Sequence, residues 1–256
     1  MLATFSLRLA CGLIACLLLL SPRQVNPRYF RTQFLVSLSL TMLAALVWGP
    51  HMGTTGAWIA LSAALIGSLL GALSWSLQGA PGGRMIVLLT AAALLAAVVQ
   101  GPEIAATFAD EEVRPAAAWR FANDVSSAAV LGTALAAMLL GHFYLIAPGM
   151  SLTPLMRLLT MFFAAVLARV LVASTALFFW TRENPLANLD MTVALYLAVR
   201  WSVGFVGPIV LGWMARESAK IRSTQSATGI LYVVVIFCFL GELAGLVLCR
   251  VTGLLF

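Results

Sequence analysis

Charged side chains are scarce in this sequence. Of its 256 residues only 9% are Asp, Glu, Lys or Arg, and Lys220 is its single lysine. Soluble domains carry about 25% charged residues, so the composition excludes both a soluble globular domain and a disordered chain. Apolar residues make up 62% of the chain, and the mean hydropathy is +1.02. These values are typical of a polytopic membrane protein.

Catalytic and cofactor motifs are also missing. The chain contains neither the HExxH zinc-protease pattern nor the GxxxxGK[ST] phosphate loop. Its four cysteines form no CxxC redox pair, and buried, inert thiols are the expectation. No predicted span holds the lysine that retinal needs. Aspartate-rich prenyltransferases need clustered Asp, and no span is expected to contain an aspartate. The sequence therefore favours a protein that is not an enzyme, although no motif decides the point.

Eight apolar stretches are long enough to cross a bilayer, which requires about 20 apolar residues per helix. They cover residues 2–20, 33–49, 56–77, 85–100, 126–147, 158–180, 191–213 and 228–250. Each run is continuous, whereas a barrel strand alternates apolar and polar residues over about ten positions. The sequence therefore predicts an all-α bundle of about eight transmembrane helices, forming one domain over 1–256.

The distribution of basic residues predicts the orientation, because short cytoplasmic loops are enriched in Arg and Lys. With the loops counted from the N-terminus, the first, third, fifth and seventh lie on the same side of the membrane. They contain eight basic residues: Arg23, Arg28, Arg31, Arg84, Arg157, Arg216, Lys220 and Arg222. Only four fall on the other side: Arg114, Arg120, Arg182 and Arg250. Both termini are thus expected outside the cytoplasm, in a bacterial-type inner membrane. The net charge of +6 then reflects topology, and no nucleic-acid partner is expected.

The longest predicted loop covers residues 101–125 on the outer side. Within it, Val113 to Ala122 contains Pro115, three successive alanines and Trp119. This composition suits a short helix that lies at the membrane interface.

Three charged residues stand well inside predicted spans, where each costs about 2.5–3.5 kcal/mol. They are Arg169, Arg200 and Glu242. At about 1.5 Å per residue, Arg169 lies roughly 15 Å above the cytoplasmic end of its span. Arg200 lies about 14 Å and Glu242 about 9 Å below the outer surface by the same measure. Because consecutive helices are usually neighbours, the three side chains are expected to meet.

This cluster carries two positive charges and one negative, and an arginine cannot lose its proton. An unpaired ion in a low-dielectric interior is costly, so the surplus calls for an anion or a strong dipole. A carboxylate, a phosphate headgroup, a haem propionate or a quinone carbonyl would serve. Tyr196, one turn from Arg200, could line the same pocket. The competing interpretation is structural, with Glu242 bridging two arginines only to fix the packing of three helices.

His142 is a further polar residue inside a span, and it is a candidate haem ligand or proton-relay group. Two histidine ligands from this chain are excluded, because His51 is the only other histidine and lies in a loop on the opposite side. A hydrogen bond to a neighbouring helix is the simpler role. Gly141 beside it would leave room either for a flat ligand or for a close helix contact.

The leading hypothesis is therefore a membrane protein that binds an anionic, quinone-like or haem b-like amphiphile between the last three spans. Such a protein would be an accessory or redox-associated component that contacts lipids and other membrane subunits. One alternative is a transporter that uses the ionic cluster for coupling and Pro208, preceded by Gly204 and Gly207, as a hinge. Another alternative is a purely structural subunit.

Overall fold

The computed structural model describes residues 1–49, 54–77, 82–101, 116–147, 149–183 and 190–252. All the regular structure in these ranges is helical, which confirms the predicted all-α bundle. The elements are α1 (Leu2–Leu17), α2 (Pro27–Trp48), α3 (Thr55–Ser74), α4 (Gly83–Val99), α6 (Ala117–Ile146), α7 (Thr153–Glu183), α8 (Met191–Trp201), η4 (Ser202–Val206), α9 (Gly207–Lys220) and α10 (Thr224–Thr252).

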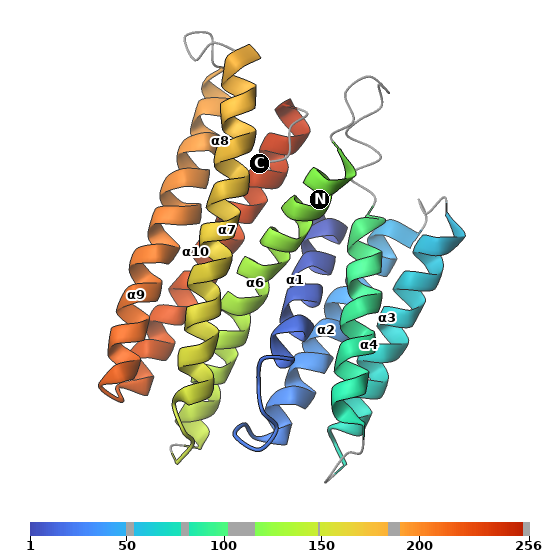
Figure 1. The fold of residues 1–256 in the computed structure, drawn as a ribbon, viewed down its shortest axis with the longest axis vertical. Helices are drawn as coiled ribbons and strands as arrows, with labels where there is room; N and C mark the ends of the chain where they lie inside the picture. The colour runs from blue at the N-terminus through green and yellow to red at the C-terminus, as the bar shows by residue number, and fades with distance from the viewer. Residues whose placement is uncertain (50–53, 78–81, 102–115, 148, 184–189, 253–256) are drawn as a thin grey trace.

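Six helical segments in the described ranges are long and apolar enough to cross a membrane, and α8, η4 and α9 together count as one of them. Two shorter apolar helices, α1 and α4, complete the bundle. Successive helices run up and down, so α1 begins and α10 ends at the same end of the molecule (Figure 1). That this end faces away from the cytoplasm stays a prediction.

Four helices, α2, α6, α7 and α10, begin four or more residues earlier than the hydropathy of the sequence indicates. The start of α2 moves from residue 33 to Pro27, because Asn26 caps the helix by accepting a hydrogen bond from the Arg28 amide at 2.9 Å. The start of α6 moves from residue 126 to Ala117. Residues 117–125 are therefore the first turns of a long helix, not a separate short one, and 102–115 lie outside the described residues.

The closest helix crossing joins the two halves of the bundle, α1–α4 and α6–α10. Helix α1 packs against α2, α4 and α6, and Figure 1 shows α6 next to α1, where the two halves meet. A Cβ atom at Gly12 of α1 would lie 1.8 Å from the Ala128 carbonyl oxygen of α6. Glycine at this point lets the two backbones touch, as small residues do between membrane helices.

The molecule is apolar outside and partly polar inside. Large apolar side chains such as Leu46, Leu77 and Met191 are 70%, 68% and 83% exposed, whereas Arg169 and Arg200 are each 1% exposed. A soluble protein rarely exposes wide apolar surface, but lipid solvates it without cost. This distribution supports an integral membrane protein whose buried charged side chains lie in the interior of the bundle.

Candidate functional site

Arg169 of α7 and Glu242 of α10 form a two-point ion pair inside the bundle. The Arg169 Nε donates to Glu242 Oε1 at 3.0 Å, and its Nη2 donates to Oε2 at 3.1 Å. Both side chains are buried. Parallel hydrogen bonds of this kind are the strongest contact that an arginine makes with a carboxylate, so this pair fixes α7 against α10.

Arg200 of α8 shares the same carboxylate. Its Nη1 donates to Glu242 Oε1 at 2.9 Å, and its guanidinium lies over the Phe205 ring, 4.5 Å from the ring centre. Its Nε and Nη2, both buried, have no hydrogen-bond partner among the described residues. The structure thus brings Arg169, Arg200 and Glu242 together. The edge of the Arg200 guanidinium formed by Nε and Nη2 makes no hydrogen bond to the described residues.

Helix α6 completes the surroundings of this cluster through hydroxyl and amide groups. Ser127 donates from Oγ to Glu242 Oε2 at 2.5 Å. Asn123 accepts at Oδ1 from the Arg169 Nη1 at 2.6 Å. These contacts place α6 beside both α7 and α10, and they satisfy groups that lipid could not.

A second ion pair, which the sequence analysis missed, lies on the other side of α6. Both Nε and Nη2 of Arg8 in α1 donate to Asp124 Oδ1, at 3.1 Å and 2.5 Å. Arg8 and Asp124 are 3% and 1% exposed. The expectation that no span contains an aspartate is therefore wrong. One signal was available, because Arg8 interrupts an apolar run and a buried arginine needs a partner.

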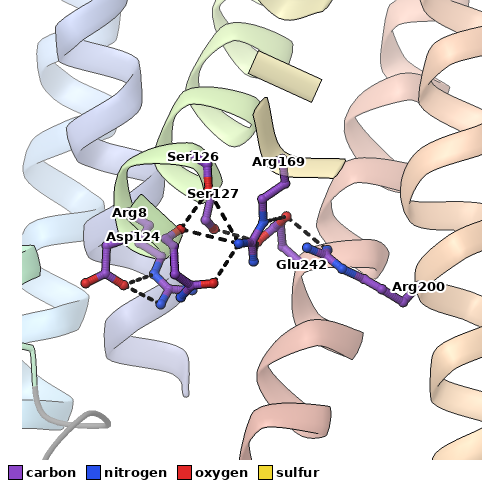
Figure 2. Close-up of polar contacts among 8 residues, drawn as sticks. Arg8, Asp124, Ser126, Ser127, Arg169, Arg200 and Glu242 are labelled. Atoms are coloured by element: carbon purple, nitrogen blue, oxygen red, sulfur yellow. Dashed lines mark hydrogen bonds and ion pairs between the residues drawn. The ribbon is translucent and has the colours of Figure 1, made fainter. Parts of the chain in front are cut away.

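Figure 2 shows the two ion pairs as parts of one network that reaches across the bundle. Asn123 and Asp124 are adjacent in α6, so the helix itself joins the Arg8 pair to the Arg169 pair. Five helices contribute to the network: α1, α6, α7, α8 and α10. It holds three arginines and two acids, and therefore carries one surplus positive charge, as the smaller cluster already did.

The sequence candidate His142 lies apart from this network. It is exposed near the far end of α6, fifteen residues beyond Ser127 and so about 22 Å along the helix axis. Gly141 beside it packs against α10, since a Cβ there would lie 2.8 Å from the Thr228 Oγ1. The glycine therefore serves a close helix contact, and His142 does not point into the bundle with the arginines.

Tyr196, the remaining candidate, lies one turn before Arg200 in α8 and is half-buried. It packs against a small apolar cluster formed by Ala176, Trp180, Val193 and Leu248. A role in holding a ligand stays a prediction. Among the described residues, no three His, Cys, Asp or Glu side chains converge in a way that could hold a metal ion.

The helix that carries Arg200 changes its winding directly after it. Ser202–Val206 form a π-helical segment, η4, in which the Gly207 amide donates to the Ser202 carbonyl. Pro208 follows in α9 and cannot donate the amide hydrogen bond that would continue a regular helix. Gly204 lets η4 cross α10 closely, because a Cβ there would lie 2.8 Å from the Gly241 Cα. Segments of this kind occur frequently at functional sites.

Comparison of the chain with protein-family models, with curated proteins and with solved structures gives no match.

Proposed function

We propose that this integral membrane protein binds an anionic amphiphile, and that Arg200 holds the anionic group. One observation carries the proposal. Arg169 uses its Nε and Nη2 atoms to grip a carboxylate, while the same two atoms of Arg200 have no partner among the described residues. The two arginines are equally buried, so the difference between them lies in what they bind.

The charge balance supports the same conclusion. The guanidinium stays protonated, and one surplus charge in a low-dielectric interior is costly unless an anion compensates it. The Nε and Nη2 groups of an arginine match two oxygens of a carboxylate or phosphate. The Phe205 ring under Arg200 compensates only part of a full charge.

The ligand class follows from the surroundings of Arg200. It must enter through lipid-facing helices and carry its charge on an apolar body, as a fatty acid, a phospholipid or a haem with propionates does. A quinone would offer only a carbonyl dipole and would leave the surplus charge in place. Ser127 contacts the same carboxylate as Arg200. Because His142 lies about 22 Å along α6 from Ser127, a haem that it ligates would not share this site. Binding, in an accessory component of a membrane assembly, fits these features better than catalysis.

The test uses dodecyl phosphate as probe, with protein purified in a neutral maltoside detergent. A ligand that binds only the folded protein stabilises it by about 2.7 kcal/mol at a hundred times its Kd, so the unfolding temperature should rise with probe concentration. Dodecyltrimethylammonium, the matched cation, should give no such rise. Arg200→Gln should abolish the response to dodecyl phosphate.

Arg182→Gln is the matched control. Arg182 also lies over a phenylalanine ring, that of Phe178, at 4.5 Å, but its side chain is exposed. The control variant should respond to dodecyl phosphate as the wild type does. Equal responses of the two variants, or equal stabilisation by the cation, would refute the proposal and leave the network a structural feature.

A second candidate function, transport, is favoured by the position of η4 alone. A π-helical segment between Arg200 and Pro208 is a point where α8 could pivot against α9, and intramembrane ions commonly mark transport paths. Counterflow of a labelled anion in proteoliposomes tests it. Uptake that depends on Arg200 would favour transport over simple binding, and its absence would leave binding as the function.

A further inference from the structure

A cavity opens between α1, α4, α6 and α7, and Arg200 is not among the residues that line it. Its volume is about 650 Å³, within the range of pockets that hold small organic molecules. Small side chains and glycine form much of its wall, among them Gly12, Ala92, Ala129 and Ala164. It faces the region that lipid would occupy, so an occupant enters from the membrane.

Asp124 is the one acidic residue among the described residues that line the cavity, and Thr133 and the thiols of Cys11 and Cys16 are the other residues there that carry a polar atom in the side chain. Its Oδ1 accepts both hydrogen bonds from Arg8, and its Oδ2 is buried without a partner among the described residues. Figure 2 shows this second oxygen directed away from Arg8 and from the rest of the network. A buried acceptor that makes no hydrogen bond costs about 1–3 kcal/mol, and more when it is charged.

We infer that the cavity binds a neutral, single-chain lipid alcohol whose hydroxyl group donates a hydrogen bond to Asp124 Oδ2. The apolar wall contacts the hydrocarbon chain, and the Asp124 carboxylate accepts a hydrogen bond from the hydroxyl group. The inference rests on the cavity and on Asp124, and it does not require the anion site at Arg200.

The charges around the cavity determine the class of head group. An anionic head would meet the Asp124 carboxylate. A cationic head would add to a network that already carries one surplus positive charge. Arg8 already neutralises Asp124, so a neutral donor satisfies the free oxygen without changing the balance. A plain hydrocarbon would fill the space but leave that oxygen unpaired.

Photolabelling tests the inference, with a hexadecanol that carries a diazirine on its chain and protein in a neutral detergent. Labelled peptides should come from α1, α4, α6 and α7. Unlabelled hexadecanol should compete at least tenfold better than hexadecane or hexadecyl phosphate, because a hydrogen bond to a charged group is worth a factor of ten or more.

Ala92→Phe should remove this labelling by filling the cavity, without touching either member of the ion pair. Ala198→Phe is the matched control, since Ala198 is also exposed but lies on α8, away from the cavity. The Arg200→Gln variant should label normally, which separates this inference from the anion site. Even labelling of all lipid-facing helices, unchanged labelling of Ala92→Phe, or equal competition by hexadecane would overturn the inference.

Discussion

Replacing Glu242 by Gln should destabilise the protein far more than removing a surface charge. The substitution removes the carboxylate that contacts both Arg169 and Arg200, so the charge of this trio rises from +1 to +2 with no change in volume. Breaking a buried ion pair from one side costs about 3–5 kcal/mol. The loss arises mainly from removing the carboxylate that two buried guanidinium groups share.

A double-mutant cycle with Arg200→Gln isolates this effect. The double variant keeps only Arg169, so the trio returns to +1. The combined loss should therefore be smaller than the sum of the single losses by about 1–3 kcal/mol. The assay is unfolding in mixed detergent micelles with increasing dodecyl sulfate, followed by fluorescence of the seven tryptophans.

The exposed pair Glu217–Lys220 provides the control. Its atoms are 2.6 Å apart, closer than either contact between Glu242 and an arginine, but both side chains are more than 40% exposed. Glu217→Gln should cost less than about 1 kcal/mol. Losses that add to within about 0.5 kcal/mol in the Glu242–Arg200 cycle, or an effect of Glu242→Gln no larger than that of Glu217→Gln, would refute the reasoning.

Three further results are expected. Gly12→Ala should destabilise the folded protein strongly in the same unfolding assay, because its Cβ would overlap the Ala128 carbonyl. Gly229→Ala, with no atom within 4 Å of the added Cβ, should be neutral or stabilising. Equal effects of the two substitutions would contradict the close crossing of α1 and α6. His142→Ala should leave the unfolding temperature unchanged, since the side chain is exposed, and a large drop would indicate a buried partner. Cysteines placed at either terminus of an otherwise cysteine-free variant should react with an impermeant thiol reagent from outside intact cells, and protection of either one would contradict the predicted orientation.

The fold could be predicted from the sequence because hydrophobic length determines which segments cross a bilayer. Eight apolar runs were sufficient to indicate the helices. The boundaries were less predictable where polar residues belong to a helix. Asn123 and Asp124 lower the local hydropathy, so the hydropathy placed the start of α6 after them. Both residues are nevertheless buried inside the bundle, where they contact Arg169 and Arg8.

The candidate site could be predicted only in part. The depths of Arg169, Arg200 and Glu242 in the membrane follow from the helical rise per residue. In the structure both arginines contact Glu242. The Arg8–Asp124 pair joins residues 116 positions apart, and no local pattern specifies such a contact. The sequence also does not indicate whether His142 faces the bundle or the lipid, because the segment around it is apolar on all sides and shows no amphipathic pattern.

The most direct test of the anion site is native mass spectrometry of protein extracted in mild detergent without delipidation. Wild-type protein and Arg182→Gln should each retain one anionic amphiphile per chain, and Arg200→Gln should have lost it. A wild-type protein that carries only neutral lipid, or an Arg200→Gln variant that retains the same anion, would contradict the account.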